Sequence, residues 1–251
     1  MILPIDLHSR YLIQAQWTWQ LRTHLYRQLK FDNQANILEV GCGSGVITDE
    51  LSKHFSGMVS GIDIDEKSIR FAHSYSKASD FSVADGCRLP FRANSFELTM
   101  CHYFLLWVSN PVLALLEMKR VTRPAGSIIA LAEPDYGGRI DYPPDFEHIA
   151  ELQEKSLSYQ GADSRMGRQL AALFHKIGLE NIETGILGGH WKKPLSPDEF
   201  ESEWLMLKSD LAGYMSNAEL EIVKEHDKKA WLNGERILYI PTFYAIGKKP
   251  R

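Results

Sequence analysis

The chain has 251 residues, of which 44% are hydrophobic and 24% are charged. This composition is ordinary for a folded globular protein and excludes a disordered chain. The length fits one large domain, or one domain with a small lid. There are 28 basic and 32 acidic side chains, so the net charge is −4, whereas a dedicated nucleic-acid binder usually carries a basic excess.

Cysteine usage and the N-terminal segment bear on where the protein works. Cys42, Cys87 and Cys101 form neither a C-x-x-C pair nor a cluster with zinc-ligand spacing, so no disulfide scaffold is expected. The N-terminal segment lacks the basic and apolar regions of a signal peptide, and no apolar run is long enough to span a membrane. We therefore expect a cytoplasmic monomer or homodimer.

The first half of the chain alternates between strand and helix patterns. Leucines at helical spacing predict a helix over residues 9–30, which Ser9 can cap. The expected strands that follow are 36–40, 58–62, 81–84, 96–101 and 127–133, and the expected helices are 46–54, 67–76 and 111–121. This alternation predicts a parallel sheet covered by helices on both faces.

After Glu133 the alternation becomes irregular. The patterns predict helices over 146–159 and 166–177, a strand over 182–187, a mostly helical segment over 192–235 and a last strand over 237–246. Pro241 in that strand indicates a bulge or an edge position. We expect residues 1–35 to be an N-terminal helical cap segment and 36–251 to be the main domain. Insertions at about 136–165 and 192–235 are expected to complete a cap over the carboxyl edge of the sheet.

The glycine-rich segment Gly41-Cys42-Gly43-Ser44-Gly45 joins the first strand to its helix. Glycines permit a sharp turn and let a ligand approach the backbone and the helix N–H groups. A P-loop needs Gly-Lys-Ser/Thr at the end of such a segment, and a dinucleotide fingerprint needs a third glycine where Val46 stands. Neither pattern is present. Glu39, an acidic residue two positions before the first glycine, further distinguishes this segment from both patterns.

Two aspartates follow the next strands. Asp63 can accept hydrogen bonds from two ribose hydroxyls, or it can cap the following helix, for which Asp65 is better placed. Asp85, which precedes Gly86, can accept from the exocyclic amine of a purine, although alone it would be a turn signal. Both aspartates lie where open α/β sheets bind ligands.

Five segments, ILEVGCGSG, GIDID, ADGCRLPF, SFELTM and LLEMKRVTRPAG, occur in this order over residues 36–135. Their order and spacing resemble the class I S-adenosylmethionine-dependent methyltransferases. The resemblance implies an α/β, Rossmann-like doubly wound sheet of seven strands whose last strand is antiparallel. One departure is Ala125, where the family usually has glycine; we expect Gly126 to supply the turn.

The resemblance also implies S-adenosyl-L-methionine as cofactor and assigns its contacts. The implied contacts are Glu39, Gly41 and Gly43 at the glycine loop, Asp63 and Ile64 at the ribose and adenine, Asp85 and Gly86 at the adenine amine, and Cys101 beside the sulfonium. A weaker resemblance to a small-molecule subgroup implies that the N-terminal helix helps to hold the cofactor's carboxylate. Arg10, Tyr11 and Gln14 are the residues concerned, and an exposed helix surface is the alternative.

Methyl transfer from a sulfonium depends mainly on positioning and on excluding water, and it needs a base only where the nucleophile must lose a proton. His102 is the best base candidate and Tyr103 the next, because both follow the fourth strand. If Cys101 faces the cofactor, side-chain alternation turns His102 away. Weaker candidates for the pocket wall are Glu133, Asp135, Tyr136, Gly188 to Trp191, Tyr239 and Tyr244.

The expected acceptor is a small, apolar or aromatic molecule methylated on oxygen, nitrogen or carbon, because a cap encloses the pocket and the chain has six tryptophans. A methyltransferase for a protein or an RNA, and a non-catalytic protein that binds the cofactor, are alternatives. The missing third glycine disfavours a nicotinamide oxidoreductase. No metal is expected, since no set of ligand residues has metal-site spacing.

Overall fold

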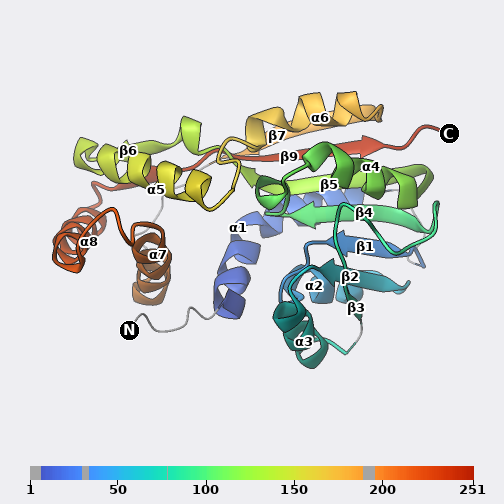
Figure 1. The fold of residues 1–251 in the computed structure, drawn as a ribbon, viewed down its shortest axis with the longest axis horizontal. Coiled ribbons are helices and arrows are strands. Elements are labelled where there is room, and N and C mark those ends of the chain that lie inside the picture. Colours follow the sequence, from blue (N-terminus) through green and yellow to red (C-terminus); the bar gives the residue numbers. More distant parts are fainter. Residues whose placement is uncertain (1–6, 30–33, 78, 189–195) are drawn as a thin grey trace.

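The computed structural model describes residues 7–29, 34–77, 79–188 and 196–251 (Figure 1). Its main sheet contains β1 Ile37–Val40, β2 Val59–Asp63, β3 Asp80–Val83, β4 Phe96–His102, β5 Thr122–Pro134, β7 Glu180–Leu187 and β9 Thr242–Lys248. The strand order is β3-β2-β1-β4-β5-β9-β7. β1 to β5 pair in parallel, whereas β9 is antiparallel to both of its neighbours. The predicted seven-stranded Rossmann-like sheet is confirmed.

Helices cover both faces of this sheet. They are α1 Leu7–Gln28, α2 Val46–His54, α3 Glu66–Tyr75, α4 Pro111–Val121 and α6 Leu170–Lys176. Successive residues of a strand point to opposite faces. Ile37 and Met100 accordingly pack with α1 and α2, whereas Leu38 and Cys101 pack with α4 and α6.

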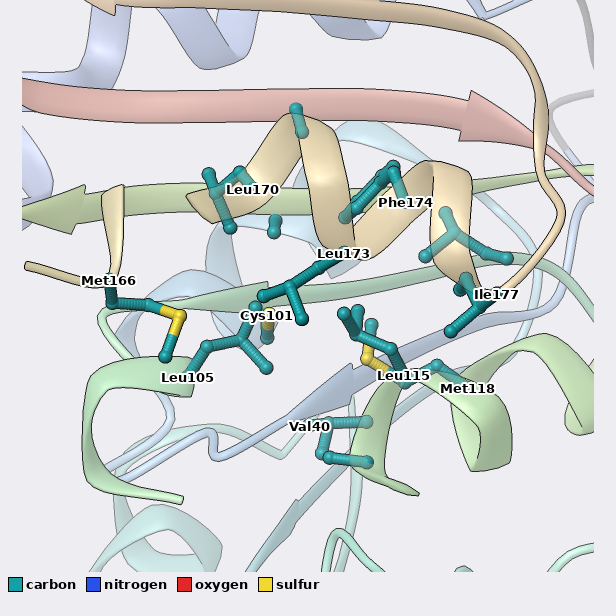
Figure 2. Close-up of a cluster of buried hydrophobic side chains, with 14 of the residues drawn as sticks. Val40, Cys101, Leu105, Leu115, Met118, Met166, Leu170, Leu173, Phe174 and Ile177 are labelled. Atoms are coloured by element: carbon teal, nitrogen blue, oxygen red, sulfur yellow. The ribbon is translucent and has the colours of Figure 1, made fainter. Parts of the chain in front are cut away.

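Figure 2 shows the core on the α4 and α6 side. Leu173 of α6 points towards Cys101 of β4 and towards Leu115 of α4 (Figure 2), whereas Phe174 lies against Gly247 of β9. Each side chain of this kind contributes about 1.5–3 kcal/mol when fully buried. This core fixes the carboxyl ends of β1 and β4, from which the candidate site is built.

A second group of elements forms the cap. It consists of α5 Glu147–Tyr159, α7 Pro197–Asp210, α8 Asn217–Leu232 and a two-stranded ribbon of β6 Ile140–Tyr142 and β8 Ile237–Tyr239. Short 3₁₀ turns cover Leu105–Trp107, Tyr136–Gly138, Pro144–Phe146 and Gly167–Gln169. In Figure 1 the cap lies at one end of the sheet, and α1 lies between the cap helices and the strands.

Buried polar contacts hold the cap together. The indole Nε1 of Trp204 donates to Asp227 at 2.7 Å, tying α7 to α8. Arg236 donates to Asp227 at 2.6 Å and to Asp141 of β6 at 2.7 Å. These charges are paired and hydrogen-bonded, which offsets the cost of taking them out of water.

Three local expectations were wrong. The strand predicted over 237–246 is two strands that break at Ile240 and Pro241; β8 pairs with β6, and only β9 joins the main sheet. Ser9 lies inside α1 and is not its cap. The left-handed residue of the turn before the core of β5 is Ala125, with φ 61°, rather than Gly126.

Candidate functional site

A cavity of about 1390 Å³ lies between the carboxyl ends of β1 to β4, α1 and the cap. Drug-sized ligands usually occupy pockets of about 300–1,000 Å³, so this cavity has room for two molecules side by side. It is lined by residues of the glycine loop and of the loops after β2, β3 and β4. Residues of α1, α5, α7 and α8 line the rest.

Two aromatic rings from other segments pack against the glycine loop. Gly41 and Gly43 have φ 75° and 51°, in the left-handed region that favours glycine. A Cβ at Gly43 would stand 2.8 Å from Cε2 of Tyr11, and one at Gly41 would overlap the ring of Phe104. The glycines thus allow the turn and admit Tyr11 and Phe104 close to the backbone.

Asp63 ties the loop after β2 to the glycine loop. Its Oδ2 accepts from the N–H of Gly43 at 2.8 Å and its Oδ1 from the N–H of Asp65 at 2.9 Å. Each carboxylate oxygen keeps a further lone pair for a ligand. Asp65 caps α3, as its position in the sequence indicates. Ile64 is 73% exposed beside Asp63 in the cavity wall, where an apolar ring could cover it.

The loop after β3 provides Asp85 and Gly86, and both line the cavity. Oδ1 of Asp85 accepts from the N–H of Cys87 at 2.8 Å, which leaves its side chain exposed on a fixed turn. Gly86 is buried, and a Cβ there would stand 2.6 Å from Cζ of Phe104. Phe104 therefore lies against both Gly41 and Gly86.

Glu39 lines the cavity but is only 2% exposed. The hydroxyl of Thr48 donates to its carboxyl group. Burial raises the pKa of Glu39 to about 8, because the charged form is poorly solvated there. The carboxyl group therefore carries a proton for much of the time at neutral pH.

The N-terminal helix α1 contributes Tyr11 and Gln14 to the wall, as expected from the sequence. Burial, and then the nearby Asp63, raise the pKa of Tyr11, so its phenol stays protonated. Arg10 also lines the cavity, but it forms an ion pair with Glu203 of α7. Its guanidinium lies 4.8 Å from the ring centroid of Trp17. Arg10 therefore links α1 to the cap.

The prediction for Cys101 was wrong. Cys101 is fully buried in the core shared with α4 and α6, as Figure 2 shows, and it does not line the cavity. Side-chain alternation along β4 brings His102 to the opposite face, and His102 lines the cavity. This is the second of the two arrangements that the sequence allows.

His102 is held by a chain of buried polar groups from α1 and α2. Its Nε2 lies 2.9 Å from Oγ1 of Thr18. Arg22 donates to that same oxygen and donates from Nε to Glu50 at 2.9 Å. Burial, and then the positive charge of Arg22, lower the pKa of His102 to about 3. The imidazole is therefore neutral at physiological pH.

Two tyrosines line the cavity next to His102. Tyr103 follows β4 with φ 51°, and Tyr136 follows β5. Within the described part of the chain, neither hydroxyl makes a hydrogen bond to another residue. Burial raises the pKa of Tyr103 well above its usual range and that of Tyr136 to about 12. Both hydroxyls are therefore available as donors to a ligand.

Glu133 has a different role from the one considered in the sequence. It is fully buried, and its carboxylate accepts from the N–H groups of Phe104, Leu105 and Leu106 at 3.0, 2.8 and 3.1 Å. It therefore fixes the turn after β4 from beneath. Burial raises the pKa of Glu133 to about 7, although these hydrogen bonds oppose the shift.

The remaining sequence candidates divide into three groups. Gly188 and Tyr239 line the cavity. Asp135 pairs with Arg168, and the hydroxyl of Tyr244 donates to Glu183 at 3.0 Å, so neither lines it. Residues 189–191 lie outside the described residues.

Sequence reasoning missed several residues of the site. Phe104 is signalled only by being a bulky residue after β4, whereas Thr18 and Arg22 reach His102 from a distant helix. No local pattern marks Asp210 of α7, which lines the cap end of the cavity. Among the described residues, no three His, Cys, Asp or Glu side chains are grouped so that they could hold a metal ion.

Comparisons with known proteins bear on this arrangement. A family model described as a methyltransferase domain matches residues 38–130. This match supports a class I S-adenosylmethionine-dependent methyltransferase domain over these residues. The matched residues contain the glycine loop, Asp63, Asp85 and His102, so the family's own segment provides the sheet side of the cavity.

Individual methyltransferases are similar over larger parts of the chain. An uncharacterized methyltransferase of Schizosaccharomyces pombe is 32% identical over 163 residues, which are 59% of this chain and 58% of that protein. This chain therefore spans less than two thirds of that relative. A demethylmenaquinone methyltransferase of Bacillus subtilis is 26% identical over 71% of this chain and 84% of its own length.

A solved structure shares the fold of this chain. Phosphoethanolamine N-methyltransferase 2 of Haemonchus contortus, in complex with S-adenosyl-L-methionine, superposes with a TM-score of 0.58. The match covers 93% of this chain and 53% of that chain at 14% identity. In the part of the chain that the structure describes, no helix is long and apolar enough to cross a membrane.

Proposed function

We propose that this protein transfers a methyl group from S-adenosyl-L-methionine to a small, apolar or aromatic molecule. The observation that carries the proposal is that one cavity joins the glycine loop, Asp63 and Asp85 to a cap lined with aromatic side chains. That cavity is large enough for a cofactor and an acceptor to lie in contact. Methyl transfer requires this contact.

The residues at the sheet end suit the cofactor chemically. The free lone pairs of Asp63 fit a pair of ribose hydroxyls, and the exposed side chain of Ile64 fits the face of a purine. Asp85 offers its second carboxylate oxygen to an exocyclic amine. We assign Tyr11, Gln14, Glu39, Gly41, Gly43 and Gly86 to the same binding site. The bound cofactor supplies a methyl group on a positively charged sulfur, which leaves as a neutral thioether.

The chain's own contribution to the reaction is positioning and exclusion of water. We assign His102 and Tyr103 to the acceptor, because both border the cavity where β4 ends. The neutral imidazole of His102 is too weak a base to hold a proton at pH 7, so it orients the acceptor by hydrogen bonding. Tyr103 and Tyr136 donate from un-ionised hydroxyls.

The names of the relatives support a small acceptor. One is a demethylmenaquinone methyltransferase, and one structural neighbour is a phosphoethanolamine N-methyltransferase bound to the same cofactor. The two named acceptors differ, so the fold does not fix the acceptor. We expect a monomer or homodimer, and the three free thiols suit a reducing cytoplasm.

Turnover tests this proposal. The purified protein is incubated with S-adenosyl-L-methionine and a panel of phenols, quinols and aromatic amines, and S-adenosylhomocysteine is measured by mass spectrometry. We expect release of this product with at least one acceptor and loss of it in Asp63→Ala. The cofactor could bind and yet no small molecule of the panel give product. If a protein or RNA extract is methylated instead, the substrate is a macromolecule.

A further inference from the structure

Asp210, the last residue of α7, lies in the wall at the cap end of the cavity. Its side chain is largely buried, with 9% of the residue exposed. Oδ2 accepts from Nε2 of Gln153 at 2.8 Å, and Oδ1 accepts from Nε2 of Gln160 at 3.4 Å. Both glutamines also line the cavity. Two neutral amides of cavity-lining residues thus hold this carboxylate in the wall.

Among the described residues, Asp210 differs from the other cap carboxylates of the cavity wall because it forms no ion pair. The other two cap carboxylates in the cavity wall, Glu203 and Asp227, pair with Arg10 and Arg236. Among the described residues, no Lys, Arg or His forms an ion pair with Asp210. Arg10 acts on Asp210 only through its charge, because its ion pair is with Glu203, so Asp210 has no cation in direct contact among the described residues.

The position makes the missing cation costly. Burial raises the pKa of Asp210, and the two amide hydrogen bonds, followed by the positive charge of Arg10, only partly oppose that shift. The carbonyl end of a helix carries partial negative charge, which further disfavours a carboxylate there. An asparagine has a single oxygen, so it would keep the 2.8 Å hydrogen bond from Gln153 and lose the 3.4 Å hydrogen bond from Gln160. The acidic residue therefore gains one long hydrogen bond and carries the cost of burying a charge.

Apolar and aromatic side chains of the cap line the same cavity as Asp210. Leu157, Trp204 and Leu207 line the same end of the cavity. Tyr103 and Tyr136 line this cavity as well, and the charge of Asp210 helps to raise the pKa of the Tyr136 phenol. A ligand that reaches both ends needs an apolar body and one group that complements a carboxylate.

We propose that Asp210 binds a protonated amine of the methyl acceptor, so that the substrate is an apolar or aromatic amine held by its ammonium group. This proposal rests on the function proposed above. A protonated amine has no free lone pair, so the atom that is methylated is another nucleophilic atom of the same molecule. Gln153 and Gln160 act as positioning residues that aim the carboxylate.

The test compares three probes of similar size: 2-phenylethylamine, 2-phenylethanol and 3-phenylpropanoate. Binding is followed by tryptophan fluorescence at pH 7, because Trp17, Trp204 and Trp231 line the cavity, with and without saturating S-adenosylhomocysteine. We expect the amine to bind about tenfold or more tightly than the alcohol, and the carboxylate to bind most weakly. In Asp210→Asn this preference for the amine should disappear.

The matched control is Asp145→Asn, which removes the same charge from an exposed position and should keep the amine preference. Equal binding of amine and alcohol to the unaltered protein would overturn the proposal, whether or not Asp210→Asn folds. The proposal would also be overturned if a folded Asp210→Asn protein still bound the amine more tightly than the alcohol. Failure of S-adenosylhomocysteine to bind would instead count against the proposed function, and the two failures are read in separate titrations.

Discussion

At the scale of single residues, burial decides the protonation states of the site. His102 is buried beside Arg22 and is neutral, whereas Glu39 is buried beside Thr48 and is largely protonated at neutral pH. Opposite shifts of the two pKa values have one cause, since a poorly solvated site disfavours whichever form is charged. Glu39 and His102 therefore add little charge to the cavity at neutral pH.

The role of His102 predicts a particular pH dependence. We expect His102→Asn to lower kcat by roughly tenfold to a hundredfold, because the acceptor would no longer be held in line with the methyl group of the cofactor. The pH profile of kcat for the unaltered enzyme should show no step near pH 6.5, because the pKa of His102 lies near 3. An inflection near 6.5 that vanishes in His102→Asn would instead identify a working base. His175→Asn, at an exposed histidine, is the control.

Glu39 predicts how stability varies with pH. Its pKa is about 8 in the folded protein against 4.5 for an unperturbed carboxyl. Its contribution to the free energy of unfolding is therefore complete below pH 4.5 and is lost as pH rises through about 8. Denaturant unfolding is measured at pH 5, 6.5 and 8. The free energy of unfolding of Glu39→Gln should rise relative to that of the unaltered protein as pH rises. Parallel curves for the two proteins would refute the assigned pKa.

At the scale of elements, the turn after β4 is the part on which the site depends. Glu133 of β5 accepts three consecutive N–H groups from this turn and holds Phe104 against Gly41 and Gly86. The turn displays Tyr103 and Phe104 to the cavity. A buried carboxylate on one strand thus positions the turn that follows its neighbouring strand.

Substitution of Glu133 tests this positioning. Glu133→Gln keeps an oxygen for the N–H groups of Phe104 and Leu105 but turns an amide N–H towards that of Leu106. We expect a loss of about 1–3 kcal/mol in the free energy of unfolding. Urea unfolding measures it, with Glu180→Gln on exposed β7 expected to change stability by less than about 0.5 kcal/mol. Equal effects of the two substitutions would contradict the role of Glu133.

At the scale of the whole molecule, the sequence predicts the sheet well because strands, glycine turns and helix caps are local patterns. Helices 46–54 and 111–121 agree with α2 and α4. The face on which Cys101 lies could not be predicted, since both faces of a parallel sheet are buried and hydrophobicity does not distinguish them. The split at Pro241, the contact of Thr18 with His102 and the place of Asp210 depend on pairings between distant segments.

The central claim is that the glycine loop, Asp63 and Asp85 form a site for S-adenosyl-L-methionine. Thermal unfolding with S-adenosyl-L-methionine, S-adenosylhomocysteine and NADH tests it most directly. A ligand at a hundred times its dissociation constant adds about 2.7 kcal/mol, which raises the melting temperature of a chain this size by roughly 5–10 °C. We predict this rise with both adenosyl ligands, none with NADH, and its loss in Asp63→Ala. No rise with either adenosyl ligand, or an equal rise in Asp63→Ala, would contradict the account.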